Sequence, residues 1–290
     1  MQSHEPDSSI LIEQGSHGVY GGSWKPSESL YLLDSGFVSI FAATFLVYYG
    51  ISCLLHFGVP RIFPVRSVRG GKKQNDADTV RDAIQSVIPV SIRAFMLYLA
   101  QMLHNKGYGV LKNDDLSEYF QSPFNVFHSI LMIFLLDVFH DTWFYFFHRL
   151  LHYPYFMKHV HYIHHQSKDP SAFSGYSFHW LEAVIMFVNA VVEIFIFPIP
   201  IQLHRIYELW MIAIHIGGHC GYEIFPYVPH VSQLLWAATG MSGDLRKLLN
   251  DVYHHDIHHQ HPGYHFSLYF THWDKLLGTI HPKWNKSVDH

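Results

Sequence analysis

The feature that most constrains the fold is a long apolar run near the start of the chain. Residues 36–59, GFVSIFAATFLVYYGISCLLHFGV, contain no Asp, Glu, Lys or Arg. About 20 apolar residues in a helix cross the hydrocarbon core of a bilayer, where the backbone must bond to itself. The run therefore predicts a membrane-spanning helix. Charged residues make up 14% of the chain, against about 25% in soluble domains, which agrees with a membrane protein.

Further apolar runs are candidates for additional spans. They are residues 84–103, 124–147, 180–203 and 206–225. Pro198 and Pro200 predict a tight turn near the end of the fourth run, so the last two runs would form a helical hairpin. We expect an all-α integral membrane protein with about four to five transmembrane helices.

The basic residues indicate how the chain is oriented. Five Arg and Lys residues lie within residues 60–73, directly after the first run, and short basic loops of this kind face the cytosol. Counting spans from this loop places every histidine-rich segment on the cytosolic side. The net charge of −4 argues against a nucleic-acid partner, which requires a basic surface.

Histidine dominates the polar part of the sequence. The chain has 26 histidines and two cysteines, Cys53 and Cys220, so a metal site would use imidazole, and zinc fingers and iron–sulfur clusters are disfavoured. Four groups have ligand spacing for a helix, on which residues three and four apart share a face. The groups are His148 and His152; His161, His164 and His165; His215 and His219; and His255, His258 and His259.

Ten imidazoles suit two metal ions, and imidazole binds iron, zinc, copper and nickel alike. No HExxH or ExxH motif lies near these groups, which argues against a metalloprotease and a ferritin-like carboxylate site. The alternative is that the rings merely line the membrane interface. We favour metal binding, because so many unpaired imidazoles at a membrane surface would be destabilising.

The order HxxxH, HxxHH, HxxHH on a chain with several spans resembles the fatty acid hydroxylase and sterol desaturase superfamily. The resemblance covers about residues 124–282 and includes DTWFYFFHRLLH, FHWLEAV, GHCGYE and YFTHWDKLLGT. The last of these segments is similar to cholesterol 25-hydroxylases, HHDIHHQ to sphingoid-base 4-hydroxylases, and residues 170–182 to sterol desaturases. The resemblance therefore indicates the superfamily and leaves the subfamily open.

Carried over by motif, the resemblance implies a set of site residues. The metal ligands would be His148, His152, His161, His164, His165, His215, His219, His255, His258 and His259, with His179 as a further candidate. The carboxylates that would orient these ligands are Asp141, Glu182, Asp256 and Asp274; each could instead be a helix cap or a solvated charge. We expect packed or interfacial roles for His140, His159, His254, His261, His265 and His272.

The resemblance also implies a chemistry. It is that of a membrane-bound di-iron oxygenase that uses O2 and external electrons to hydroxylate an unactivated C–H bond of a sterol, a sphingoid base or a fatty acyl chain. Two Fe ions would be bound, and Zn would fit the same ligands after purification. Cytochrome b5 or its reductase is implied as a separate electron donor. The alternatives are a lipid or sterol desaturase with the same site and, in another class, a metal transporter or a haem-binding membrane protein.

These expectations divide the chain into four parts. Residues 1–35 would be a polar, disordered tail, residues 36–123 the first transmembrane helices with the basic loop, residues 124–282 the catalytic domain, and residues 283–290 a short tail. A cytosolic, histidine-rich helical cap would hold the di-metal site. The expected location is the endoplasmic reticulum membrane, with a bacterial membrane as the alternative.

Overall fold

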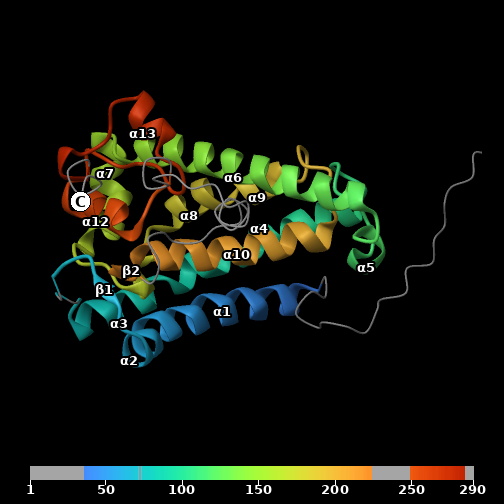
Figure 1. Cartoon of the computed structure of the whole chain (residues 1–290). Helices are drawn as coiled ribbons and strands as arrows, with labels where there is room; N and C mark the ends of the chain where they lie inside the picture. Colours follow the sequence, from blue (N-terminus) through green and yellow to red (C-terminus); the bar gives the residue numbers. More distant parts are fainter. Residues whose placement is uncertain (1–35, 71, 73, 224–248, 285–290) are drawn as a thin grey trace, which may run out of the picture. The chain divides into compact units, whose positions relative to one another are not determined.

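The computed structural model describes residues 36–70, 72, 74–223 and 249–284. The amino-terminal tail and most of the carboxy-terminal tail expected from the sequence lie outside these residues. The described chain is mostly helical, as predicted (Figure 1).

The elements follow one another along the chain with few strands. The α-helices are α1 (Phe37–Cys53), α2 (Val59–Ile62), α3 (Asp76–Gln85), α4 (Val87–Asn105), α5 (Leu116–Tyr119), α6 (Pro123–Leu151), α7 (Pro154–His159), α8 (Trp180–Phe187), α9 (Asn189–Glu193), α10 (Ile201–His219), α12 (Val252–Gln260) and α13 (His272–Leu276). A π-helical turn (Leu54–Gly58), two 3₁₀ turns (His161–Gln166 and Ala172–Ser174) and an antiparallel pair of strands, β1 (Arg66–Ser67) and β2 (Tyr222–Glu223), complete them.

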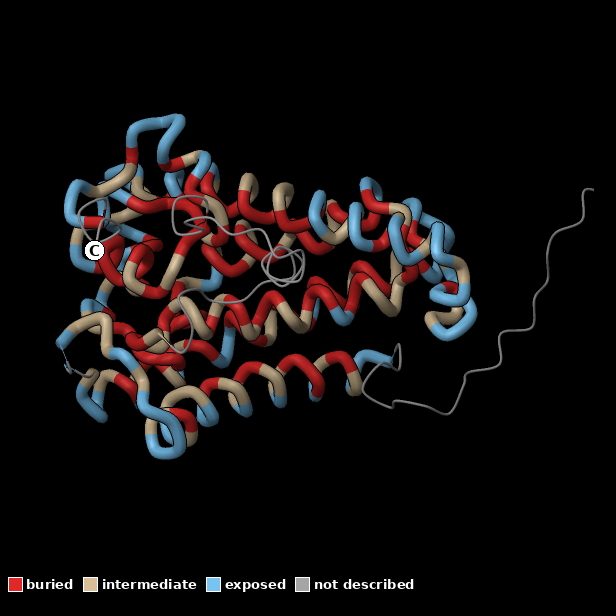
Figure 2. The backbone as a smooth tube through the Cα atoms, in the orientation of Figure 1, coloured by how far each residue is buried: buried red, intermediate tan, exposed pale blue. Residues whose placement is uncertain are grey.

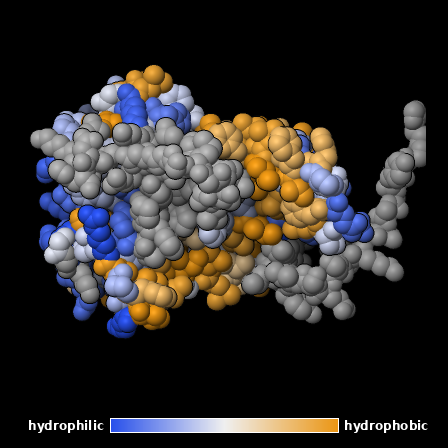
Figure 3. Space-filling view, in the orientation of Figure 1, coloured by the Kyte–Doolittle hydropathy of each residue, from blue (hydrophilic) through white to orange (hydrophobic). Residues whose placement is uncertain are grey.

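Three helical stretches of the described chain are long and apolar enough to cross a membrane. They are Phe37–Ile62, Asp76–Asn105 and Pro123–Leu151, and they cover the first three runs expected from the sequence, apart from Gly36 at the start of the first. Large apolar side chains on them face outward, including Leu46, Phe124 and Phe127 at 65%, 72% and 65% exposure. Figure 3 shows apolar residues gathered over the helices and hydrophilic residues at the end that carries α7 and α12. Outward apolar side chains of this kind fit contact with lipid.

The fourth expected span is not one continuous helix. Residues 180–203 contain α8 and α9, a non-helical stretch after Glu193, and the first three residues of α10. At the break, the Asn189 side chain donates to Glu193 Oε1 at 2.9 Å and lies 3.2 Å from His140 Nδ1. The side chain at the start of α9 is thus engaged in polar contacts at the position where a straight membrane-spanning helix would continue. The expected number of four to five transmembrane helices is not confirmed by the described residues.

The helices pack around a shared core. Helix α1 contacts α4 and α10, α4 also contacts α8 and α9, and α6 contacts α8. Figure 2 shows the buried residues on the faces that these helices turn toward one another. Tyr48, Phe144, Tyr176, Phe187 and Ile212 belong to the largest buried apolar cluster. This packing brings the carboxy-terminal ends of α6 and α10 close to α12.

Candidate metal centre

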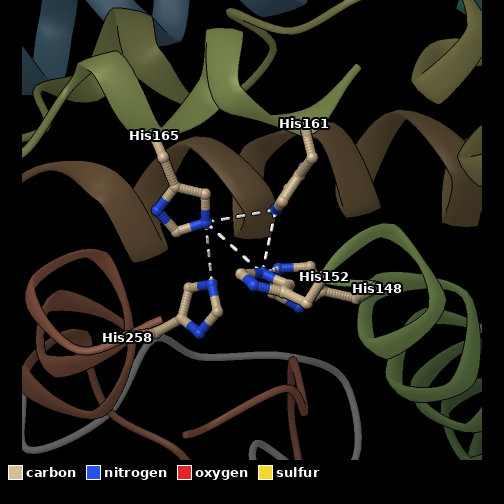
Figure 4. A group of neighbouring side chains, drawn as sticks. All are labelled: His148, His152, His161, His165 and His258. Carbon is tan, nitrogen blue, oxygen red and sulfur yellow. Dashed lines mark hydrogen bonds between the residues drawn. The ribbon is translucent and has the colours of Figure 1, made fainter. Parts of the chain in front are cut away.

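Five histidines form a first cluster. His148 and His152 come from the end of α6, His161 and His165 from the following 3₁₀ turn, and His258 from α12; one ring nitrogen of each lies within 4.8 Å of all the others. Figure 4 shows these rings converging on a common point. His152 Nε2 lies 3.3 Å from His148 Nε2, 3.0 Å from His161 Nε2 and 3.3 Å from His165 Nε2. His258 Nε2 lies 3.2 Å from His165 Nε2.

Four histidines form a second cluster. His164, His219, His255 and His259 also bring one ring nitrogen each within 4.8 Å of the others, and all four side chains are buried. His219 Nε2 lies 3.4 Å from His164 Nε2 and 2.8 Å from His255 Nε2. His255 Nε2 lies 3.3 Å from His259 Nε2.

The two HxxHH motifs are shared between the clusters. His161 and His165 belong to the first cluster, while His164 belongs to the second. On α12 the pattern is reversed, because His255 and His259 belong to the second cluster and His258 to the first. Adjacent residues on an α-helix point about 100° apart, whereas residues four apart share a face. The doublet His258–His259 on α12 therefore contributes to both clusters at once.

Hydrogen bonds fix which ring nitrogen carries the proton. A carbonyl oxygen only accepts, so the Nδ1–H group donates in His148 to Phe266 O (3.1 Å), in His258 to Tyr264 O (2.6 Å) and in His219 to His215 O (2.8 Å). In a neutral ring of this tautomer, Nε2 carries only a lone pair. The Nε2 lone pairs of His148 and His258 therefore point at other rings of the first cluster, and that of His219 points at rings of the second; a cation bound between the rings would balance them.

The spacing of the nitrogens matches metal coordination. With metal–nitrogen bonds of about 2.1 Å, neighbouring ligand nitrogens lie about 3.0 Å apart in an octahedron and about 3.4 Å apart in a tetrahedron. The short Nε2–Nε2 contacts above run from 2.8 to 3.4 Å. The donor set is purely imidazole nitrogen, which suits iron, zinc, copper and nickel. The residues therefore fit two metal ions, one in each cluster.

Burial keeps these imidazoles uncharged. Loss of solvent, together with the charge that neighbouring imidazoles would carry, lowers the pKa of His165 to about 3. The same causes place the pKa values of His161, His164, His255 and His258 well below the usual 6.5. Neutral rings are the form that binds a metal.

The candidate carboxylates differ in what they contact. Glu182 Oε1 accepts from His161 Nδ1 at 2.8 Å, so Glu182 directly orients a cluster histidine. Asp141 Oδ1 accepts from the backbone N–H groups of residues 268–270 at 2.9, 2.6 and 3.3 Å. Asp274 accepts from the backbone N–H of Phe266 at 2.9 Å. Asp141 and Asp274 thus hold the segment whose Phe266 carbonyl orients His148.

Asp256 has a different role from its neighbours in the sequence. Its side chain pairs with Arg69, and both side chains are almost fully buried. Gln260 Nε2 donates to its second oxygen at 2.7 Å. Arg69 also donates to Pro170 O at 2.7 Å. This ion pair therefore fastens the loop before α3 to α12, and Asp256 positions the helix that carries three cluster histidines.

Two histidines expected as ligands lie outside both clusters. His215 packs its ring against His219, with centroids 5.2 Å apart, and lines a cavity beside the clusters. His179 is the N-cap of α8, and its Nδ1 accepts from the backbone N–H of Leu181 at 3.2 Å. The structure therefore brings together nine of the histidines that the motifs single out.

The surplus histidines have packing partners of other kinds. His254 and His265 stack with centroids 3.7 Å apart, and His261 stacks on His281 with centroids 4.5 Å apart. His140 lies in a third polar group with Glu193 and Glu208, which sequence reasoning did not identify. The available signal was the presence of ionisable residues inside apolar runs.

A cavity opens beside both clusters. The cavity is small and partly open to the outside. Cluster residues His148, His161 and His164 line it together with apolar side chains; the apolar lining consists of Phe144, Tyr176, Phe178, Met186, Phe187 and Met211. Small-molecule sites commonly combine such apolar walls with a few polar groups.

The sequence matches known proteins over the region that carries the clusters. The family model for fatty acid hydroxylase matches residues 132–279. Lathosterol oxidase from Homo sapiens is 27% identical over 69% of the chain and 60% of the relative. A cholesterol 25-hydroxylase-like protein from Danio rerio is 32% identical over 47% of the chain and 51% of the relative.

Methylsterol monooxygenase 1 from Rattus norvegicus is 29% identical over 49% of the chain and 44% of the relative. In each of these comparisons the match spans less than two thirds of the relative's own length. No solved structure matches the chain significantly. The family match extends over half of the sequence and includes all nine clustered histidines. The chain belongs to the fatty acid hydroxylase family.

Proposed function

We propose that the protein is a membrane-bound di-iron oxygenase that uses O2 and external electrons to hydroxylate an unactivated C–H bond of a lipid. The observation that carries this proposal is that two clusters of buried imidazoles adjoin one cavity with apolar walls. The family membership and the names of its relatives, an oxidase, a hydroxylase-like protein and a monooxygenase, support it.

One iron ion would be held by His148, His152, His161, His165 and His258, and the second by His164, His219, His255 and His259. Iron in these positions supplies the activation of O2 and the oxidation of the C–H bond. Zn would fit the same nitrogens on purification. Electrons would come from cytochrome b5 or its reductase. The location would be the endoplasmic reticulum membrane, with the clusters facing the cytosol.

The residues of the chain itself contribute binding, orientation and exclusion of water. The phenyl and thioether side chains of the cavity walls take up a hydrocarbon chain or ring and keep bulk water from it. Glu182 fixes the orientation and the tautomer of His161 through their 2.8 Å contact. The backbone carbonyls bonded to His148, His219 and His258 do the same for those rings.

Lipid mass spectrometry on yeast membranes tests this proposal. Yeast would express either the natural chain or the double variant His164→Ala/His165→Ala, which removes one ligand from each cluster, and would be supplied with a sterol, a sphingoid base and a fatty acid. We expect a lipid that gains one oxygen only with the natural chain. A lipid that loses two hydrogens would indicate a desaturase instead.

Two further outcomes would contradict a di-iron lipid oxidase altogether. One is that neither lipid change appears, although both proteins are present in the membrane with donor protein added. The other is a haem absorption band in the purified protein, which would indicate a haem-binding membrane protein.

A further inference from the structure

We propose that Asp82 on α3 is a positioning residue for both histidine clusters. Its buried carboxylate holds residues 167–177, which directly follow the turn His161–Gln166, and thereby sets where that turn places its cluster histidines. Asp82 lies outside residues 132–279, the part of the chain that the family model matches. The inference rests on the metal-binding part of the proposed function and adds to the centre a residue from the amino-terminal helices.

Three serines of residues 167–177 converge on the carboxylate of Asp82. Its Oδ2 accepts from the hydroxyl groups of Ser167 and Ser174, both at 2.6 Å, and its Oδ1 lies 3.2 Å from the hydroxyl of Ser177. All four side chains are buried. A separation of about 2.5–2.7 Å is typical of a hydroxyl that donates to a carboxylate. The two shorter contacts therefore tie this segment to α3.

The same carboxylate is also paired within its own part of the chain. Arg81 donates to Oδ1 of Asp82 through Nε at 3.1 Å and Nη2 at 2.9 Å, and Gln74 Nε2 donates to Oδ2 at 2.7 Å. Arg81 Nη2 also donates to the hydroxyl of Ser167 at 3.0 Å. Buried carboxylates are stable in a protein when donors of this kind surround them. Asp82 is therefore fixed on α3 independently of the serines and is a rigid acceptor for them.

The serines lie next to residues of the metal centre. The backbone N–H of Ser167 donates to the carbonyl of His164 at 3.3 Å. Ser177 directly precedes Phe178, whose ring packs edge-on against that of His164 with centroids 5.9 Å apart. The turn that ends before Ser167 supplies histidines to both clusters. A shift of residues 167–177 would therefore move ligands of both clusters at once.

Other contacts of the segment that leads to Asp82 hold the remaining ligand-bearing elements. Strand β1 pairs with β2, which begins three residues after His219. Arg69 pairs with Asp256 on α12. Residues 66–82 thus contact the chain beside three groups of ligands. Because each cluster takes its ligands from several elements, the relative positions of these elements set the distances between the ligand nitrogens.

A purely stabilising role and a positioning role predict different results. If the contacts of Asp82 only added to stability, their loss would lower the melting temperature and leave the metal affinity of the folded protein unchanged. If they place the turn, their loss would alter the nitrogen–nitrogen distances in both clusters and weaken both metal sites together. Replacement of one cluster histidine, such as His258, would weaken one site only.

Ser167→Ala/Ser174→Ala tests the inference with the least disturbance of the fold. This double variant removes both hydroxyls that bind Oδ2, while Asp82 keeps its contacts with Arg81 and Gln74. Zinc titration of the metal-free full chain in detergent, against a chromogenic chelator, measures both affinities. We expect both affinities to fall about tenfold, near the lower end of the range for groups that orient metal ligands, and to fall at least as far in Asp82→Ala. Unchanged affinities, or weakening of one site alone, would overturn the inference.

Cobalt provides a readout that a loss of stability alone would not change. The visible absorption of bound Co²⁺ depends on the number and geometry of its ligands, so the double serine variant should show a changed spectrum at metal saturation. Asp78→Asn is the matched control, because Asp78 is also on α3 and pairs with Arg81; it should keep the natural affinities and spectrum. A double variant with a lower melting temperature but the natural affinities and spectrum, or an equal effect of Asp78→Asn, would refute the positioning role.

Failure of this inference is distinguishable from failure of the proposed function. Natural affinities in the double serine variant of a chain that does bind metal would refute the role of Asp82 alone. Parallel weakening of both sites, without any oxidation of lipid by the natural chain, would support the role of Asp82 and refute the oxygenase. A natural chain that takes up no metal would refute both.

Discussion

Replacing His258 or His259, which are neighbours on α12, tests whether the two clusters are separate metal sites. His258 belongs to the five-histidine cluster and His259 to the four-histidine cluster. His258→Ala would therefore leave four nitrogens in the first site, and His259→Ala would leave three in the second. Each substitution should lower the metal affinity of one cluster and leave that of the other cluster unchanged.

The magnitude follows from the ligand count. A four-ligand structural zinc site contributes about 10–16 kcal/mol of binding free energy, or about 2.5–4 kcal/mol per ligand if shared equally. Loss of one ligand should therefore weaken the affected site about 10²–10³-fold. The metal affinity should decrease more in the second site, because His259→Ala leaves three nitrogen ligands there, whereas His258→Ala leaves four in the first.

Zinc titration of the metal-free protein against a chromogenic chelator measures this effect. The natural chain should take up two tight equivalents, and each variant one tight and one weakened equivalent. His261→Ala is the matched control, because His261 follows α12 directly and stacks on His281 outside both clusters. The reasoning would be refuted if His258→Ala and His259→Ala each abolished both equivalents, or if neither changed the titration.

Three further changes have defined outcomes. Glu182→Gln replaces the carboxyl group that accepts from His161 Nδ1 and should weaken zinc binding about 10–100-fold; an unchanged titration would contradict that role. Asp141→Asn weakens the charged hydrogen bonds to the backbone of residues 268–270 and should cost about 1.5–3 kcal/mol, seen as a lower melting temperature in detergent. Burial and the nearby His254 lower the pKa of His265 to about 2. Below pH 6.5 the unfolded chain therefore binds a proton at this residue that the folded chain does not. The free energy of unfolding then decreases by about 1.4 kcal/mol for each unit by which the pH is lowered. His265→Asn, which tolerates the φ of 60°, should lose less melting temperature than the natural chain between pH 7.5 and 5.5; identical losses would count against this assignment.

The sequence predicted the parts of the molecule that depend on local spacing. Apolar runs located the three candidate spans, because burial of apolar side chains and the length of a helix are both local properties. Intervals of four residues likewise predicted that His148 and His152, or His255 and His259, would share a cluster. Both kinds of inference need only one helix at a time.

Features that depend on how helices meet were not predicted. The assembly of each cluster from both doublets depends on how α12 packs against the turn at His161–Gln166. At the break between α8 and α9, the Asn189 side chain contacts His140, which is on another helix. His179 was a candidate ligand and is a helix cap; its position directly before α8 was the available signal.

The most direct test of the central claim is oxygen transfer by the purified chain. Metal-free protein would be loaded with Fe²⁺ or with Zn²⁺, supplied with a sterol and an electron donor, and exposed to ¹⁸O₂. The proposal predicts a lipid alcohol that contains one ¹⁸O atom, formed only with iron and not by His164→Ala/His165→Ala. A product without ¹⁸O, or equal turnover with zinc, would contradict it.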